Sequence, residues 1–324
     1  MKKTIYTTAL ASLLLAGCSQ EESMNIGEEV QVTFTANISN GVQSRNGEGN
    51  TVDVDQLICA VCTQTVTGET ASLGDELFRD TVTVDQATGK ATFSPSLLKG
   101  KEYGIVFWAY SSASENAVNT EEFSKIQFTA DNDPVFYTST IKDVKVGSSS
   151  TDVKLTRNLA QINIATTLSD WDMVETLGET LEGATATITL TGCSNTYNAL
   201  QGTYSGNETF TYEVSLDETN KLGDFILLGQ GYTFPGSNVD CSISVKNKDD
   251  VEIYALSVPS VPTTANYRTN IVPSTSTENQ TGGLMTGSAS YEVTITPGYN
   301  TEETNKTPEE LQEEAKNNNQ ENNE

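Results

Sequence analysis

The sequence predicts an all-β protein made of two consecutive β-sandwich domains. Apolar and polar residues alternate with a period of two in most segments, which is typical of strands that bury one face. Turn-forming residues separate these segments, and helical periodicity is almost absent. The linker-like run Gly147-Ser148-Ser149-Ser150 predicts a boundary between an N-terminal sandwich at residues 30–150 and a C-terminal sandwich at residues 151–300.

The first strand of the N-terminal sandwich is expected at its very start. Five apolar residues alternate there with polar ones, and the pattern stops at the turn signal Ser39-Asn40-Gly41. A polar, glycine-rich loop follows and contains Arg45, although arginine is scarce in this chain. The apolar residues of the strand are Val30, Val32, Phe34, Ala36 and Ile38.

Three further segments of this half carry clear strand signals. Residues 81–94 predict a hairpin with its turn around Ala87-Thr88-Gly89. Residues 101–112 are apolar on both faces of a strand, which predicts a position in the centre of a packed sheet. Residues 138–146 alternate again and predict one more strand.

The C-terminal sandwich is expected to hold a series of strands and one short helix within residues 168–181. Beyond residue 300 the chain is rich in Glu and Asn, and Leu311 is its one large apolar residue, so residues 301–324 are expected to form a disordered acidic tail. The strands are expected within residues 152–166, 183–192, 208–216, 224–230, 239–247, 251–258, 266–272 and 289–296.

Composition argues against several classes of function. The net charge of −26 would repel a phosphate backbone, so nucleic-acid binding is not expected. The absence of histidine removes the Ser-His-Asp and Cys-His nucleophile systems and histidine-ligated zinc. A glycosidase-type carboxylate pair is compatible with the composition, but no sequence feature points to one. We therefore expect no enzyme, no cofactor and no catalytic or metal-binding residue.

The cysteines beyond the N-terminal segment are interpreted as structural. Cys59 and Cys62 have CxxC spacing, but in a strand their side chains point to opposite faces. Both are therefore expected to be buried apolar residues and not a redox or zinc pair. Cys193 and Cys241 lie in the C-terminal half, where a disulfide between them is one alternative that spacing cannot decide.

Residues 1–17 are predicted to be a signal peptide. Lys2 and Lys3 precede an apolar run that is too short to span a bilayer as a helix. The run ends in Leu15-Ala16-Gly17-Cys18, which resembles the lipobox of bacterial lipoproteins. This resemblance implies a diacylglycerol on Cys18, with residues 18–29 as a tether; the alternative is a secretory signal with an incidental cysteine. Ser19-Gln20-Glu21-Glu22 also resembles the acidic signal that sends Bacteroidetes lipoproteins to the cell surface.

Several features of the sequence, taken together and in their order along the chain, resemble those of the fimbrillin superfamily of Bacteroidales, which comprises the major and minor subunits of type V pili. The resemblance implies a subunit with two transthyretin-like domains, exported to the cell outer membrane as a lipoprotein. The tail beyond Tyr299 departs from the family pattern. The features are the lipobox, a first strand followed by Arg45 in a loop, two sandwiches, Arg157-Asn158-Leu159-Ala160-Gln161-Ile162 and Asn266-Tyr267-Arg268-Thr269-Asn270-Ile271-Val272.

The resemblance also implies a mechanism of assembly. An arginine-specific or trypsin-like protease would cut between Arg45 and Asn46, and loss of the first strand would open a groove that a neighbour's strand fills. The candidate donor strand carries Tyr291, Val293 and Ile295 on one face. Two alternatives stay open: Arg45 as an ordinary solvated loop residue, and the candidate donor as an ordinary core strand of the second sandwich.

The function expected from the sequence is that of a structural subunit of a cell-surface fimbria, with a role in adhesion as a further expectation. Its partners would be other fimbrial subunits, the processing protease and the outer membrane through the lipid anchor. The alternative is a monomeric surface lipoprotein that binds glycans or host proteins.

Overall fold

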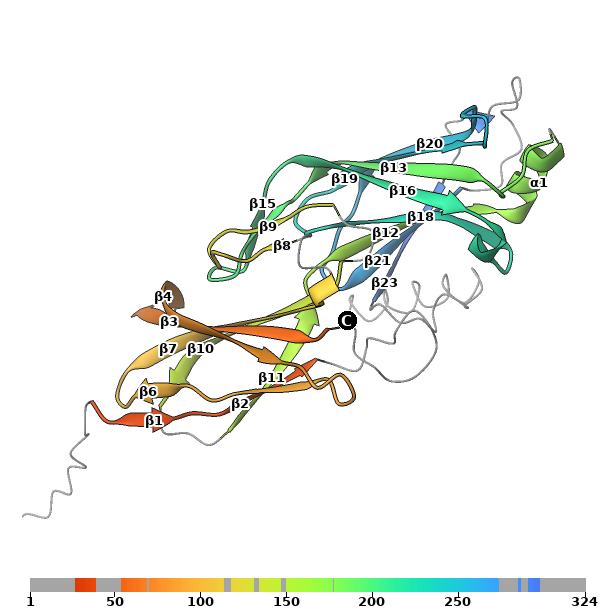
Figure 1. Cartoon of the computed structure of the whole chain (residues 1–324). Helices are drawn as coiled ribbons and strands as arrows, with labels where there is room; N and C mark the ends of the chain where they lie inside the picture. Colours follow the sequence, from red (N-terminus) through yellow and green to blue (C-terminus); the bar gives the residue numbers. More distant parts are fainter. Residues whose placement is uncertain are drawn as a thin grey trace, which may run out of the picture.

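The computed structural model describes residues 27–38, 54–68, 70–113, 118–130, 134–146, 150–176, 178–273, 285–286 and 291–297. This part of the chain is built mainly from strands, which confirms the predicted all-β class. In Figure 1 the strands up to Arg157 form mainly the lower group, and the strands from Ala160 onward form the upper group. The helix α1 (Leu168–Thr176) falls within the range predicted for it.

The N-terminal group is one long sheet with the strand order β4-β3-β7-β10-β11-β2-β5. Side chains of β3 and β7 share a core with those of β2, β5 and β11, so the sheet folds over on itself as a sandwich. A separate pair is formed by β1 (Glu29–Gln31) and β6 (Ser96–Leu98). The strands of the long sheet are β2 (Phe34–Ile38), β3 (Gln56–Thr67), β4 (Thr70–Thr83), β5 (Lys90–Phe93), β7 (Glu102–Tyr110), β10 (Phe136–Lys145) and β11 (Thr151–Arg157).

Strand β7 lies between β3 and β10 and is buried on both faces. Ile105 and Phe107 belong to the core that β2 completes. Val106 and Trp108 belong to a second core, which is shared with the C-terminal group. The central position predicted for the strand within residues 101–112 is therefore confirmed, and its two apolar faces pack in two different cores.

The C-terminal group consists of two five-stranded sheets, with the orders β17-β18-β12-β21-β23 and β16-β13-β19-β20-β22. Apolar side chains from both sheets fill the space between them. Their strands are β12 (Ala160–Thr167), β13 (Ala184–Cys193), β16 (Glu208–Leu216), β17 (Lys221–Leu222), β18 (Phe225–Thr233), β19 (Val239–Lys246), β20 (Glu252–Val261), β21 (Tyr267–Pro273), β22 (Met285–Thr286) and β23 (Tyr291–Pro297).

A third sheet, with the order β15-β14-β9-β8, ties the two groups together. β8 (Val118–Asn119) and β9 (Ile126–Phe128) come from the N-terminal half of the chain, and β14 (Thr196–Asn198) and β15 (Thr203–Ser205) from the C-terminal half. Figure 1 shows β8 and β9 beside β15 in the upper group. Phe128 packs edge-on against Phe210 with 5.3 Å between ring centroids, so one core runs through both groups.

The structure corrects three details of the predicted strand pattern. The strand expected at residues 30–38 is divided, because β1 pairs with β6 whereas β2 pairs with β5 and β11. The hairpin expected at residues 81–94 forms only at its turn, where Asp85 and Lys90 make one antiparallel bridge around Ala87-Thr88-Gly89; the strands on either side have other partners, because β4 pairs with β3 and β5 pairs with β2. Strand β11 lies beyond the boundary expected at residue 150 but belongs to the N-terminal sheet, because Val153 and Leu155 are buried in that core.

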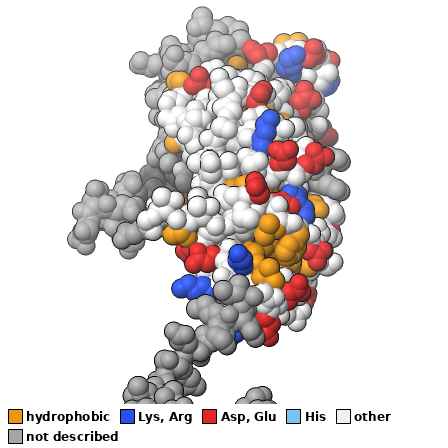
Figure 2. All heavy atoms as spheres, turned by 90° about the vertical axis from the view of Figure 1, so that its left-hand side faces the viewer, with side chains coloured by type: hydrophobic (Ala, Val, Ile, Leu, Met, Phe, Trp, Pro, Cys, Tyr) orange, Lys and Arg blue, Asp and Glu red, His pale blue; other side chains and the backbone are white. Residues whose placement is uncertain are grey.

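Small polar and charged side chains cover most of the face shown in Figure 2. Hydrophobic side chains gather in its lower part, with Asp and Glu around them. Leu77 and Phe78 lie where the register of the edge strand β4 shifts against β3, an irregularity that obstructs pairing between sheet edges. The exposed large hydrophobic residues of the described part are Val66, Leu77, Phe78, Leu98 and Val251.

Candidate functional site

The first candidate site is the place that β2 occupies in the N-terminal sheet. β2 lies between two strands that are far from each other in the sequence, β11 on one side and β5 on the other. It runs parallel to β11, with Phe34 opposite Thr151 and Ile38 opposite Leu155. It runs antiparallel to β5, with Phe34 opposite Phe93. β2 is therefore an interior strand, although it lies near the beginning of the chain.

The side chains of the predicted first strand close the N-terminal core. Val32, Phe34 and Ala36 are each 1% exposed and Ile38 is 2% exposed, while Val30 is only half-buried. The Phe34 ring lies 6.4 Å from the ring of Phe93 and 5.9 Å from that of Phe107, measured between centroids. These contacts join β2 to both layers of the sandwich.

Backbone hydrogen bonds continue beyond the two ladders of β2. The Val32 N–H donates to the Pro95 carbonyl at 3.0 Å, and the Ile38 N–H donates to the Gly89 carbonyl at 2.9 Å. The Thr151 N–H donates to the Thr33 carbonyl at 2.9 Å. Removing residues 30–38 would thus leave a row of unpaired backbone groups on both β11 and β5.

The candidate donor strand corresponds to β23, which pairs with β21 over seven residues from Tyr267↔Pro297 to Pro273↔Tyr291. It is the last strand in its sheet order, so its backbone has a neighbour on one side only among the described strands. The structure describes the backbone of β23 but not the side chains of Tyr291, Val293 and Ile295. In this state the strand completes the C-terminal sheet of its own chain.

Several predicted site residues lie outside the described residues. These are Cys18, which is the predicted lipidation site, and Arg45 and Asn46, which flank the predicted cut. Residues 39–53, which contain the predicted cut, connect β2 to the segment that leads into β3. Cleavage there would leave β1 and β2 without a covalent link to the rest of the sheet.

The two short motifs that support the family resemblance meet across β12 and β21. Gln161 lies opposite Arg268 in the parallel register of these strands. The Asn163 Nδ2 donates to the Asn270 Oδ1 at 2.8 Å, so polar side chains continue the contact along the pair. The Arg157 guanidinium lies 5.7 Å from the centroid of the Tyr137 ring. Sequence reasoning found these motifs but not that they pair with each other.

The cysteines occupy the positions that the sequence predicts. Cys59 lies in the core closed by β2, and Cys62 lies in the core shared with the C-terminal group. Their side chains are therefore on opposite faces of β3. Cys193 and Cys241 are both buried and free, so the alternative of a disulfide between them is not found. Burial raises the pKa of Cys62 and of Cys193 to about 11 each and that of Cys241 to about 12, and it raises the pKa of Cys59 further.

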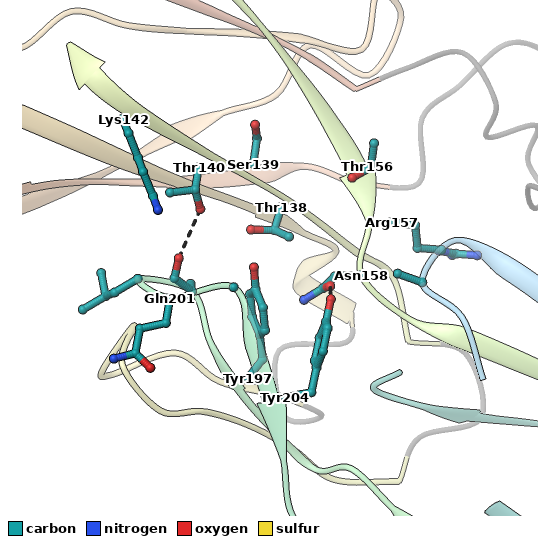
Figure 3. Close-up of a pocket in the computed structure, with 14 residues that line it drawn as sticks. Thr138, Ser139, Thr140, Lys142, Thr156, Arg157, Asn158, Tyr197, Gln201 and Tyr204 are labelled. Carbon is teal, nitrogen blue, oxygen red and sulfur yellow. Dashed lines mark hydrogen bonds between the residues drawn. The ribbon is translucent and has the colours of Figure 1, made fainter. Parts of the chain in front are cut away.

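The described residues contain no group of three or more His, Cys, Asp and Glu side chains placed to hold a metal ion. None of the helices within those residues is both long enough and apolar enough to cross a membrane. Two hollows lie in the region where the two groups of strands meet, and each is lined by residues from both halves of the chain. One of them is shown in Figure 3.

A protein-family model with the description "Family of unknown function (DUF6562)" matches residues 22–319. The chain therefore belongs to this family of unknown function. No curated protein matches it.

Solved structures similar to the chain include two fimbrial proteins. One is the tip fimbrial protein Mfa3 from Porphyromonas gingivalis with a C-terminal truncation, at 12% identity and a TM-score of 0.48, covering 83% of this chain and 99% of that one. The other is a fimbrial assembly protein from Parabacteroides distasonis ATCC 8503, at 12% identity and a TM-score of 0.43, covering 83% of this chain and 95% of that one.

Proposed function

We propose that this chain is a structural subunit of a cell-surface fimbria that polymerises by exchange of a β-strand between subunits. The observation that carries the proposal is the position of β2. It is buried and interior in the sheet, yet only one connection, residues 39–53, joins it to the rest of the core. A strand of this kind can be lost after a single cut in the chain.

Loss of β2 would leave a groove that strongly favours a replacement strand. The four fully buried residues of the predicted first strand contribute roughly 5–10 kcal/mol by the apolar area that they remove from water, as an upper bound. The unpaired backbone groups of β11 and β5 would add to the attraction for an incoming strand. Because cleavage is irreversible, it would drive the exchange forward even where the two strands bind equally well.

Strand β23 of a second copy is the proposed replacement. It has seven residues and can span the groove left by the five residues of β2. Its apolar residues Tyr291, Val293 and Ile295 repeat the spacing of Phe34, Ala36 and Ile38. Its edge position means that it can leave β21 without disrupting a strand on its other side in the described part of the sheet.

The remaining parts of the proposal concern export and processing. Cys18 carries a lipid that anchors the precursor in the outer membrane, and an arginine-specific or trypsin-like protease cuts between Arg45 and Asn46. Other fimbrial subunits are the partners that accept and donate strands. The proposal assigns no catalysis and no cofactor to the chain.

The experiment is mass spectrometry and polymer analysis of the protein recovered from the cell surface, comparing the wild type with Arg45→Ala. We expect wild-type chains to begin at Asn46 and to form polymers, and Arg45→Ala chains to begin at a lipid-bearing Cys18 and to stay monomeric. Ser44→Ala is the matched control, because it alters the same loop without removing the basic residue. Normal polymer ladders from Arg45→Ala would refute the processing step.

A further inference from the structure

The hollow in Figure 3 lies between the sheet of the N-terminal group and the β14–β15 turn of the C-terminal group. We name it the junction pocket. Its volume of about 390 Å³ falls in the range of roughly 300–1,000 Å³ that small-molecule sites occupy. Its lining residues are Thr138, Ser139, Thr140, Lys142, Thr156, Arg157, Asn158, Tyr197, Ala199, Leu200, Gln201, Gly202, Tyr204 and Ala265.

Hydrogen bonds hold the two walls of the junction pocket in place. The Thr140 Oγ1 of β10 donates to the Ala199 carbonyl at 3.2 Å, which links one wall to the other. The Tyr204 hydroxyl donates to the Asn158 Oδ1. The Leu200 and Gln201 N–H groups each donate to the Asn198 Oδ1 at 3.1 Å, which fixes the β14–β15 turn. The walls are therefore preformed, which reduces the entropic cost of binding a ligand.

The polar groups of the junction pocket include both donors and acceptors. The Thr138 Oγ1 and the Thr140 Oγ1 each donate to a backbone carbonyl and keep lone pairs that can accept from a ligand hydroxyl. The Asn158 Nδ2 is a buried donor with no hydrogen-bond partner among the described atoms. The stacked rings of Tyr197 and Tyr204, with centroids 4.9 Å apart, form one side of the pocket. Such a mixture of hydroxyl, amide and aromatic groups fits a hydroxyl-rich ring.

The charge of the junction pocket is opposite to that of the chain. The chain has a net charge of −26, yet none of the lining residues is Asp or Glu. Figure 3 shows the Lys142 ammonium directed toward the side of the hollow where Gln201 lies, while the Arg157 guanidinium points away from it. The neighbouring Asp143 carboxylate accepts from the Gln64 Nε2 at 2.5 Å, outside the lining. An anionic group entering the pocket would therefore meet a cation and no carboxylate among its lining residues.

We propose that the junction pocket binds a sugar unit that bears a carboxylate. Lys142 pairs with the carboxylate, Gln201 and the Asn158 amide donate to ring or hydroxyl oxygens, and Thr138 and Thr140 accept from hydroxyl groups. Most of these residues lie on β10 and in the β14–β15 region, and Asn158 directly follows β11, the strand that pairs with β2. None of them belongs to β2 itself, so the assignment does not require strand exchange. It would serve adhesion in a polymer or in a single subunit.

The test uses two probes that differ at one carbon, methyl β-glucuronide and methyl β-glucoside. The full chain is titrated with each, and binding is followed by the amide NMR shifts of Gln201 and Gly202. We expect the glucuronide to bind about 3- to 10-fold more tightly than the glucoside, with the difference shrinking as salt is added. Equal binding of both probes, or no shift at these two residues, would overturn the proposal.

Two lysine variants separate the role of Lys142 from general charge. Lys142→Met keeps the aliphatic stem and removes the ammonium, so we expect it to bind both probes equally. Lys145→Met removes an exposed charge from the same strand but from outside the pocket lining, so it should keep the preference for the glucuronide. A preference that survives in Lys142→Met, or is lost in Lys145→Met, would contradict the assignment. Matching thermal unfolding curves show that both variants are folded.

Discussion

β2 and β23 lie near opposite ends of the chain and hold opposite positions in their sheets. β2 has a neighbour on each side, β11 and β5, whereas β23 pairs, among the described strands, with β21 alone. Loss of β2 would open a groove inside a sheet, whereas loss of β23 would uncover only the outer edge of β21. A strand near one end of the sequence can thus be interior in its sheet, which is the combination that strand exchange needs.

A shared arrangement underlies this difference. In the N-terminal group the early strand β2 runs parallel to the last strand β11, and in the C-terminal group the first strand β12 runs parallel to the late strand β21. β12 is joined to the chain on both sides and cannot be removed by one cut. Among the described strands, β2 combines a parallel interior position with a single connection, residues 39–53, to the strands that follow it.

The largest effect is expected when β2 is absent. A chain that begins at Asn46 should expose the core that contains Cys59, while Cys62 stays in the core shared with the C-terminal group. The raised pKa of Cys59 would fall toward its usual value on exposure, so at about pH 8 its thiolate would react at least about 10-fold faster than in the complete chain.

Peptide mapping after timed thiol labelling measures the rate at each cysteine in this shortened chain. Cys193 and Cys241 serve as internal controls, because neither belongs to the core that β2 closes. Equal acceleration of all four cysteines would indicate general unfolding instead of an opened groove.

A large effect on stability is expected from Phe34→Ala. The side chain is 1% exposed and packs on Phe93 and Phe107, so its truncation should lower the free energy of unfolding by about 3–5 kcal/mol. Thr35→Ala is the control on the other face of β2 and should cost less than about 1 kcal/mol. Urea unfolding followed by tryptophan fluorescence compares the two. Similar losses would mean that β2 does not close the core.

Val293→Asp should separate assembly from folding. If β23 is the donor, a carboxylate on the face that enters the groove would prevent polymerisation, because burying an unpaired charge is costly. The monomer should stay folded with a moderately lower thermal midpoint, because Val293 lies opposite the buried Ile271 in a ladder at the edge of the sheet. Thr294→Asp places the same charge on the other face and should polymerise. A strongly destabilised Val293→Asp monomer would instead identify β23 as an ordinary core strand.

The smallest effect is expected from deletion of residues 301–324. Pro297 ends β23 and its pairing with β21, so residues beyond it add nothing to the described ladder. Polymer yield and the thermal midpoint should stay within experimental scatter of the wild type. A marked gain or loss of polymer would assign the acidic tail a part in assembly.

Several elements could be read from the sequence because their signals are local. Alternation identified β2, β11, β19 and β21 as strands, and the segment at residues 101–112, which is apolar on both faces, identified β7 as central. The opposite faces of Cys59 and Cys62 followed from their spacing in one strand. The junction pocket had no such signal, because Lys142, Asn158 and Gln201 come together only through the packing of the two halves.

Periodicity between neighbouring residues was enough to identify most of the longer strands and their apolar faces, although not β4. The tertiary structure alone decided the partners of each strand. β5 follows the predicted turn but joins β2 instead of β4, and β11 follows the predicted linker but completes the N-terminal sheet. The physical reason is that ladder hydrogen bonds are similar for any pair of strands, so the choice among partners depends on which pairing buries the apolar faces of distant segments together.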